Sequence, residues 1–161
     1  NVINELQNTN IIFTKTNSDL DGKIINQMID RFTKKYSNKS TAFTSLGQIK
    51  YLSTLQYIDV VVGNSSSGLI EAPSFKVATL NIGDRQKGRI KAKSVIDCYP
   101  NKKSIRSSLK KIYSKDFQKS LNDVNNPYDN GLPSKKIVRI LKNSKLQNIL
   151  KKKFYNIDLK L

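Results

Sequence analysis

Apolar residues along the chain fall into short runs and into longer segments with helical spacing. β-branched runs at residues 58–63 and 77–82 predict two strands that are buried on both faces. Shorter apolar runs at 10–14, 41–44 and 94–98 predict three further strands. Strand patterns therefore recur through the first hundred residues.

Helical patterns separate these strands. Apolar residues spaced three and four apart over 20–32 and 49–55 predict two helices. A helix of about two turns is expected between the two buried runs, a later helix begins at Asn101, and another is expected to be capped by Ser134. Strands that alternate with helices predict an α/β fold, a Rossmann-like doubly wound parallel sheet.

The length of the chain, 161 residues, fits a single domain, and we find no internal repeat or long linker. Residues 142–161 are expected to form a basic terminal helix. The single cysteine cannot form an intrachain disulfide, and neither a signal segment nor an apolar stretch long enough to span a membrane is present. We therefore expect a cytoplasmic protein without a membrane partner.

The net charge of +17 is concentrated toward the end of the chain, where residues 100–161 hold 16 Lys and Arg against 4 acidic residues. Such a segment can attract phosphate backbones. However, only 5 of the basic residues are arginine, and the aromatic residues do not alternate with the lysines as stacking platforms would. We interpret the charge as a solvated helical face and expect no nucleic-acid partner.

Small polar residues follow the first buried run, where Asn64, Ser65, Ser66 and Ser67 precede the short helix. In an open parallel sheet, ligands bind beyond the carboxyl ends of the strands. The N–H groups of a helix start and the serine hydroxyls can donate to an anion, and Gly63 and Gly68 would let a phosphate approach the backbone. This stretch predicts a phosphate site.

Two charged residues are expected at the same edge. Glu71 follows the serines by about one helical turn and could accept from ribose hydroxyls. Arg85 follows the second buried run and could bind the same anion with two donors. In the alternative interpretation the serines only cap the helix, Glu71 complements its dipole, and Arg85 pairs with Asp84 or Asp97.

Two familiar phosphate motifs are absent from this sequence. The stretch lacks the Gly-Lys-Ser/Thr of a Walker A loop and the G-x-G-x-x-G of dinucleotide-binding folds. NTP hydrolysis and NAD chemistry therefore receive no support, and we expect neither a cofactor nor a metal ion.

The sequence "VVGNSSSGLIEAPSF" followed by "NIGDRQKGR" resembles the signature of the hydrolysing UDP-N-acetylglucosamine 2-epimerases. Three further segments are similar to motifs of that family and occur in the same order: "TNSDLDGK" at 16–23, "SLGQIKYLSTL" at 45–55 and "NPYDNGLPSKKIVRIL" at 126–141. The resemblance covers nearly the whole chain. It corresponds to only the carboxyl half of the family's two-domain, glycosyltransferase-B-like architecture, and the resemblance implies that the first strand of that half is missing.

The resemblance implies that this half binds UDP. It places Ser65 and Ser66 within the 64–67 turn on the diphosphate, Glu71 on the ribose and Arg85 near the phosphates. It also places Asn17 at the cleft and a loop containing Ser45 and Gly47 beside uracil. The acid–base carboxylates belong to the other half, and the family's functional histidine follows the missing strand, which agrees with a chain that contains no histidine.

The intact protein is then expected to convert a UDP-sugar into UDP and an N-acetylmannosamine-type sugar for sialic-acid-like sugar biosynthesis, and to be a homo-oligomer. The present chain, without its N-terminal domain, is expected to be inactive, weakly stable and prone to self-association. Lys76 replaces the glycine of a Gly-x-Pro turn, and Lys23 replaces an arginine of the family motif. Two alternatives are the donor-binding domain of a UDP-sugar glycosyltransferase and a basic interaction module without catalysis.

Overall fold

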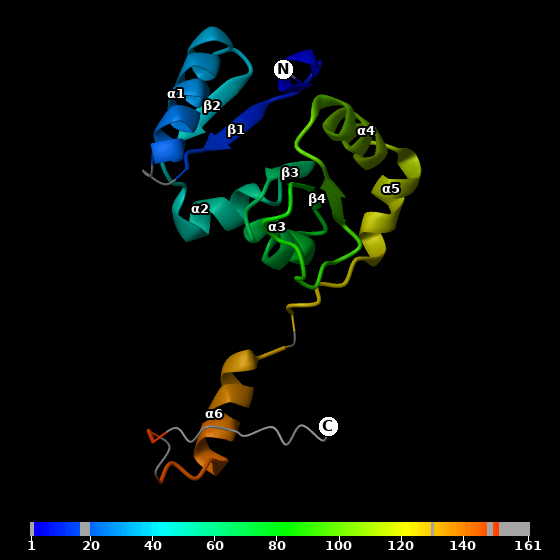
Figure 1. Cartoon of the computed structure of the whole chain (residues 1–161). Coiled ribbons are helices and arrows are strands. Elements are labelled where there is room, and N and C mark those ends of the chain that lie inside the picture. The colour runs from blue at the N-terminus through cyan, green and yellow to red at the C-terminus, as the bar shows by residue number, and fades with distance from the viewer. Residues whose placement is uncertain (1, 17–19, 130, 148–149, 152–161) are drawn as a thin grey trace, which may run out of the picture. The chain divides into compact units, whose positions relative to one another are not determined.

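The computed structural model describes residues 2–16, 20–129, 131–147 and 150–151. The backbone divides into two compact units, residues 1–129 and 130–161. The first unit, coloured blue to yellow in Figure 1, contains every strand that the structure describes. No helix among the described residues is long and apolar enough to cross a membrane.

All the described strands pair in parallel, in two sheets. One sheet has the order β1-β2 and the other the order β3-β4-β5. The bounds are β1 Ile11–Thr14, β2 Ser40–Phe43, β3 Val60–Gly63, β4 Ala78–Ile82 and β5 Val95–Cys98. Each predicted strand is therefore confirmed within one or two residues, and the Rossmann-like α/β class is confirmed. The described strands nevertheless form two sheets and not the expected continuous one, because β1 and β3 do not pair.

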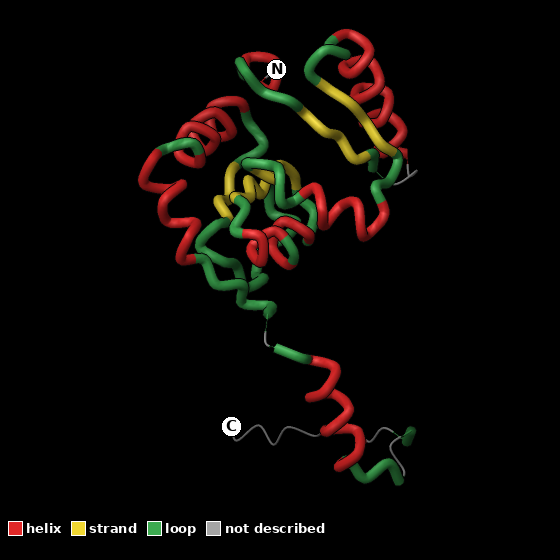
Figure 2. The backbone as a smooth tube through the Cα atoms, turned by 180° about the vertical axis from the view of Figure 1, so that it is seen from behind, coloured by secondary structure: helices red, strands yellow, loops and turns green. Residues whose placement is uncertain are grey.

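Helices follow or connect these strands (Figures 1 and 2). The α-helices are α1 Leu20–Lys35, α2 Gly47–Thr54, α3 Ser67–Ile70, α4 Lys102–Ile112, α5 Lys115–Ser120 and α6 Pro133–Asn143. The 3-10 helices are η1 Val2–Glu5, η2 Ala72–Phe75 and η3 Leu121–Asp123. The expected helix between the two buried runs is therefore a single α-helical turn, α3, followed by the 3-10 turn η2.

The core of the first unit lies around β4, and in Figure 2 the β3–β5 sheet lies among helices and loops. Ala78 and Leu80 are fully buried and share a cluster with Leu109 and Ile112 of α4. β4 is thus buried along nearly its whole length, as predicted. The prediction for β3 is wrong at Val62, whose side chain is 44% exposed, since β3 has a described neighbour on one edge only.

The helix caps were predicted with mixed success. Asn101 caps α4, where its side chain accepts a hydrogen bond from the Ser104 backbone N–H at 2.8 Å. The prediction for Ser134 is wrong, because α6 begins one residue earlier at Pro133 and Leu132 occupies the cap position. Proline stabilises a first helical position because its φ angle is already fixed there. Helix α5, capped by Ser114, was not predicted.

The second unit consists, in its described part, of α6 and a short non-helical segment. The helix ends at Asn143, and residues 144–147 are not helical, so the expectation of a basic terminal helix over 142–161 fails for that part. Residues 152–161 lie outside the described residues. The apolar side chains of α6 are about half exposed within this unit. The expectation of a single UDP-binding domain over 1–161 stays a prediction.

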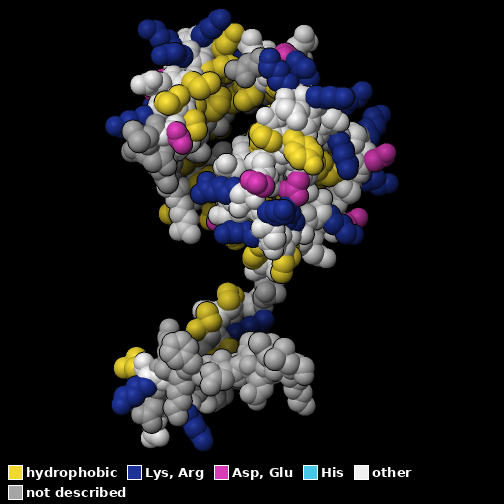
Figure 3. All heavy atoms as spheres, viewed as in Figure 1, with side chains coloured by type: hydrophobic (Ala, Val, Ile, Leu, Met, Phe, Trp, Pro, Cys, Tyr) yellow, Lys and Arg dark blue, Asp and Glu magenta, His cyan; other side chains and the backbone are white. Residues whose placement is uncertain are grey.

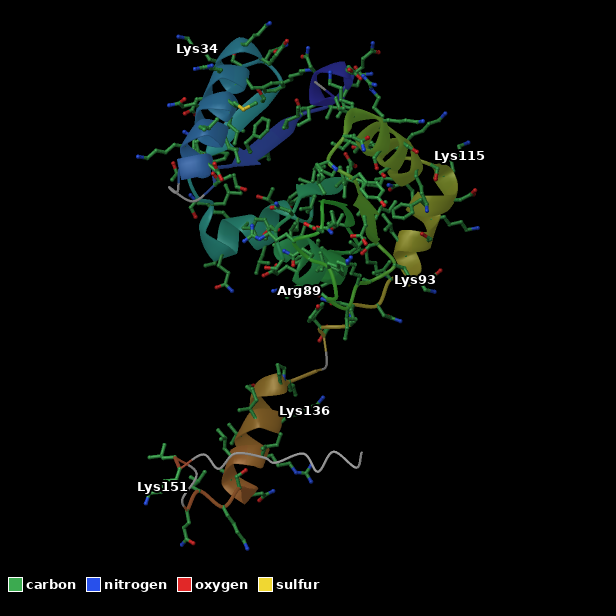
Figure 4. All side chains as sticks on the ribbon, in the orientation of Figure 1. Lys34, Arg89, Lys93, Lys115, Lys136 and Lys151 are labelled. Carbon is green, nitrogen blue, oxygen red and sulfur yellow. The ribbon has the colours of Figure 1, made fainter. Side chains whose placement is uncertain are left out.

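Basic side chains are dispersed over the first unit. Figure 3 shows Lys and Arg scattered among other residues on the face in view, and Figure 4 shows the labelled cations projecting outward from separate elements. Lys34 lies in α1, Lys115 in α5, and Arg89 and Lys93 in the connection between β4 and β5. On this face the charge does not form one continuous stripe.

Candidate functional site

The polar residues 64–67, here called the serine turn, connect β3 to α3. The backbone of Gly63 has a φ angle of 154°, which side chains rarely permit. The Ser65 hydroxyl accepts from the Ser67 N–H at 3.3 Å, and the Ser65 carbonyl accepts from the Gly68 N–H at 3.3 Å. These local hydrogen bonds stabilise the turn, although the helix that follows it, α3, has only four residues.

The Ser66 hydroxyl is not used for capping. Ser66 occupies the cap position of α3, but its side chain makes no cap hydrogen bond, and no described residue bonds its hydroxyl. The alternative in which the serines serve only as caps therefore fits Ser65 but not Ser66. Because α3 has only four residues, its dipole is small, and the donors of the turn are its backbone N–H groups and hydroxyls.

The glycine that follows the turn serves packing. The Thr79 hydroxyl of β4 donates to the Gly68 carbonyl at 2.8 Å, and both residues are buried. A Cβ atom on Gly68 would lie 2.5 Å from the Thr79 methyl carbon. The missing side chain therefore lets α3 approach β4, and the interpretation that it also lets a phosphate approach the backbone stays a prediction. This close contact holds α3, which follows the serine turn, against the first half of β4.

Residues 83–89, here called the arginine loop, leave the carboxyl end of β4. Because Gly63 pairs with Asn81 across β3 and β4, the two strands end side by side. The Gln86 side-chain amide donates to the Asn64 carbonyl of the serine turn at 2.7 Å. The arginine loop and the serine turn are therefore in direct contact.

Arg85 is exposed in this loop and forms no ion pair with a described residue. Its proposed alternative partner Asp97 is occupied, since that carboxylate accepts from the Asn81 amide at 2.7 Å and pairs with Lys91 at 2.6 Å. Burial acts to raise the pKa of the Asp97 carboxyl, but hydrogen bonds from Lys91 and Asn81 hold the pKa below its ordinary value. Arg85 is thus available for a ligand.

Glu71 ends α3 and is half-buried. One of its carboxylate oxygens, Oε2, is buried and makes no hydrogen bond with a described residue. A buried acceptor without a donor is costly, so this atom is suited to a ligand hydroxyl or a water molecule. Glu71 therefore presents an acceptor beside a turn that presents donors.

Helix α2 brings a phenol to the same place. The hydroxyl groups of Tyr51 and Ser67 are hydrogen-bonded to each other. Burial raises the pKa of the Tyr51 phenol, the Ser67 hydrogen bond opposes this, and the negative charge of Glu71 raises the pKa further. The phenol therefore stays protonated at neutral pH, and it ties α2 to the start of α3.

The loop before α2 has a defined local structure. The Ser45 hydroxyl accepts from the Gly47 N–H at 3.1 Å, and Gly47 has a φ angle of 64°, which favours glycine. Both residues are exposed. The loop reaches the serine turn through α2 and Tyr51, while the predicted site residue Asn17 lies outside the described residues.

Residues 126–128, here called the strap, contact both sides of the site. The Asn126 side-chain amide donates to the Ile70 carbonyl of α3 and to the Ser74 hydroxyl, both at 2.7 Å. The Tyr128 hydroxyl donates to the Ile90 carbonyl, just after the arginine loop, at 3.0 Å. The strap thus holds α3 and the end of that loop from the same segment.

Sequence reasoning missed Gln86, Tyr51 and the anchoring role of the strap. Gln86 stands between charged residues in a polar loop, so its pattern does not indicate burial. Tyr51 lies in a segment quoted for its resemblance, but a periodicity argument does not reveal its partner. Among the described residues no cluster of three His, Cys, Asp or Glu side chains could hold a metal ion.

Comparison with known proteins gives consistent matches. The model of a family described as UDP-N-acetylglucosamine 2-epimerase matches residues 1–142. The chain is 41% identical over 156 residues to a GDP/UDP-N,N'-diacetylbacillosamine 2-epimerase (hydrolyzing) of Campylobacter jejuni, and this match covers 96% of the chain and 40% of that protein. It is 40% identical over 149 residues to the polysialic acid biosynthesis protein P7 of Escherichia coli, covering 91% of the chain and 37% of that protein.

Another relative and a solved structure agree with these matches. A UDP-N,N'-diacetylbacillosamine 2-epimerase (hydrolyzing) of Legionella pneumophila is 31% identical over 135 residues, covering 84% of the chain and 34% of that protein. A crystal structure assigned as a UDP-N-acetylglucosamine 2-epimerase of Listeria monocytogenes matches with a TM-score of 0.65 at 17% identity, covering 88% of the chain and 38% of that structure. The chain thus spans about two-fifths of the length of such relatives.

Proposed function

The chain belongs to the UDP-N-acetylglucosamine 2-epimerase family, and we propose that it forms the UDP-binding part of a hydrolysing member. The complete protein would convert a UDP-sugar into UDP and the 2-epimeric N-acetylmannosamine-type sugar. The names of the relatives support a role in sialic-acid-like or bacillosamine-type sugar biosynthesis. A cytoplasmic location and a homo-oligomeric assembly are part of this proposal.

The observation that carries the proposal is the contact between the serine turn and the arginine loop. The hydrogen bond from Gln86 to Asn64 joins two loops that leave the adjacent ends of β3 and β4. Ligands of open parallel sheets bind at this edge. We assign Ser65, Ser66 and Arg85 to the diphosphate, because the loops are in contact and Ser66 and Arg85 have no described side-chain partner.

We assign Glu71 to the ribose. Its buried Oε2 atom lacks a donor among the described residues, and ribose supplies two hydroxyl donors. We assign the loop with Ser45 and Gly47 to the uracil side, since α2 leads from this loop to Tyr51 beside Ser67. Asn17 is proposed at the cleft on the family resemblance alone.

The chemistry of these residues is that of a leaving-group site. In the reaction that the family implies, the C2 proton is removed, UDP departs to leave a 2-acetamidoglucal, and water adds to give the epimer. Departure of UDP places negative charge on the diphosphate. Donors already placed around that charge lower the barrier, and one such donor can contribute about 3 kcal/mol. The acid–base groups would come from the other part of the protein, so this chain alone is expected to be inactive.

Replacing the arginine tests this assignment in the complete protein. We expect Arg85→Ala to lower kcat about 10²-fold with unchanged thermal stability, because it removes charge stabilisation from the departing diphosphate. Steady-state kinetics with UDP-N-acetylglucosamine and no acceptor measure this effect. The matched control is Arg31→Ala, which removes an exposed arginine from α1.

Each contrary outcome has a definite meaning. Equal turnover of Arg85→Ala and the unmodified protein would remove Arg85 from the diphosphate site. Release of free N-acetylmannosamine without an acceptor supports an epimerase, whereas product formation that requires an acceptor would replace this proposal with a glycosyltransferase. Loss of UDP binding in parallel with duplex DNA binding as salt rises would indicate a basic interaction module.

A further inference from the structure

Gln86 is buried in a loop that is otherwise largely exposed. Its side chain is 3% exposed, while its neighbours Arg85 and Lys87 are exposed. The amide Nε2 donates to the Asn64 carbonyl at 2.7 Å across 22 residues of sequence. A polar side chain that turns inward from a surface loop indicates that its contact determines where the loop lies.

This hydrogen bond is the single direct link of its kind between the two loops among the described residues. The β3–β4 ladder ends with the pairing of Gly63 and Asn81, before either loop begins. Beyond that point no other hydrogen bond joins the serine turn to the arginine loop in the described part of the chain. Gln86 therefore ties the middle of the arginine loop to the serine turn, while the strap holds the residue just after the loop.

The other end of the same amide is not satisfied. The Gln86 Oε1 atom is buried and has no hydrogen-bond partner among the described residues. A buried acceptor without a donor costs free energy, so an apolar side chain of similar shape would be favoured if packing were its sole role. Burying this amide therefore has a stability cost, which the hydrogen bond of its Nε2 atom to the serine turn offsets only in part.

We infer that Gln86 is a positioning residue that holds Arg85 against the serine turn for the diphosphate of a nucleotide. The inference rests on the proposed function. Because consecutive Cα atoms lie about 3.8 Å apart, anchoring Gln86 to Asn64 also keeps the backbone of Arg85 close to the serine turn, from which a long side chain can reach a diphosphate. Gln86 acts through Arg85 and is not assigned a contact with the nucleotide.

The test compares UDP and uridine binding to the chain by titration calorimetry. In Gln86→Met, which keeps the side-chain volume but removes the donor, we expect UDP affinity to fall about tenfold. Uridine affinity should be unchanged, because uridine lacks the diphosphate. Gln86→Leu provides a second donor-free variant in case the methionine variant does not fold, and thermal unfolding checks both.

A double-mutant cycle separates positioning from general loosening of the fold. If Gln86 acts through Arg85, Gln86→Met should have little further effect on UDP affinity in the Arg85→Ala background. Additive losses would overturn the inference. The matched control is Gln118→Met, since the Gln118 amide donates to the Ile112 carbonyl at 2.8 Å in the same way but joins α5 to α4.

The outcomes also distinguish this inference from the proposed function. If the unmodified chain binds UDP no better than uridine, it has no diphosphate pocket. That result would overturn both the proposed function and this inference. An unmodified chain that prefers UDP, with that preference intact in Gln86→Met, overturns the inference alone. A loss of preference in Gln86→Met but not in Gln118→Met supports it.

Discussion

At the scale of single residues, the candidate site contains some residues whose position could be predicted from the sequence and others whose role could not. Ser65, Ser66 and Arg85 stand just after apolar runs, so their place at strand ends could be predicted. Gln86 and Tyr51 could not, because their roles depend on partners 22 and 16 positions away. Burial within a polar loop is a property of the assembled fold and leaves no periodic pattern.

The contact between Gly68 and Thr79 yields a prediction at this scale. We expect Gly68→Ala to destabilise the first unit by about 1–3 kcal/mol, because the new methyl group meets the Thr79 methyl carbon. Adding Thr79→Ser removes that methyl group but keeps the hydroxyl that donates to the Gly68 carbonyl. The double variant should therefore recover much of the loss.

Denaturant unfolding of the two single variants and the double variant measures the coupling. Strictly additive free energies of unfolding would mean that the two side chains do not meet. Gly47→Ala is a useful comparison, since a Cβ there has open space around it and meets only the strain of a positive φ angle.

At the scale of elements, local residue patterns predicted the strands and most of the helices. They could not predict which strands pair with each other. The β-branched composition of β3 and β4 marks both as strands, but no local pattern shows that β1 and β3 do not pair. The start of α6 illustrates competing signals, because Pro133 and Ser134 each mark a helix start and the proline prevails. Helix α5 was missed because it has only six residues.

The cap of α4 yields a prediction at the scale of elements. Asn101→Ala removes the acceptor of the Ser104 N–H and should lower the free energy of unfolding by about 1 kcal/mol. The effect reaches the core because α4 contributes Leu109 and Ile112 to it. Ser107→Ala, on an exposed position of the same helix, should be neutral or slightly stabilising. Equal stability of the two variants in thermal unfolding would contradict the capping role.

At the scale of the whole molecule, open strand edges and exposed apolar side chains favour self-association. β1 and β3 each have a described strand neighbour on one side only, and Ile12 and Val62 on these strands are 46% and 44% exposed. Figure 3 shows apolar side chains gathered over the part formed by β1, α1 and β2. Unpaired strand edges present backbone donors and acceptors as well as apolar surface.

We therefore expect the chain to associate with rising concentration across the micromolar range, as measured by sedimentation velocity. Val62→Lys should weaken association, because a charge at the edge of β3 opposes pairing with another strand. Ile140→Lys on α6 should have a smaller effect, since the backbone of a helix is already satisfied. A monomer at all concentrations, or a larger effect of Ile140→Lys, would contradict this explanation.

Under the proposed function, the strap also determines how short a nucleotide-binding piece of this chain can be. Its anchors on Ile70, Ser74 and Ile90 come from Asn126 and Tyr128, which follow the last described strand by more than twenty residues. A chain shortened to the end of α5 would retain all five described strands but lose three hydrogen bonds around the loops at once. A piece of the chain that keeps these anchors must therefore extend at least to Tyr128.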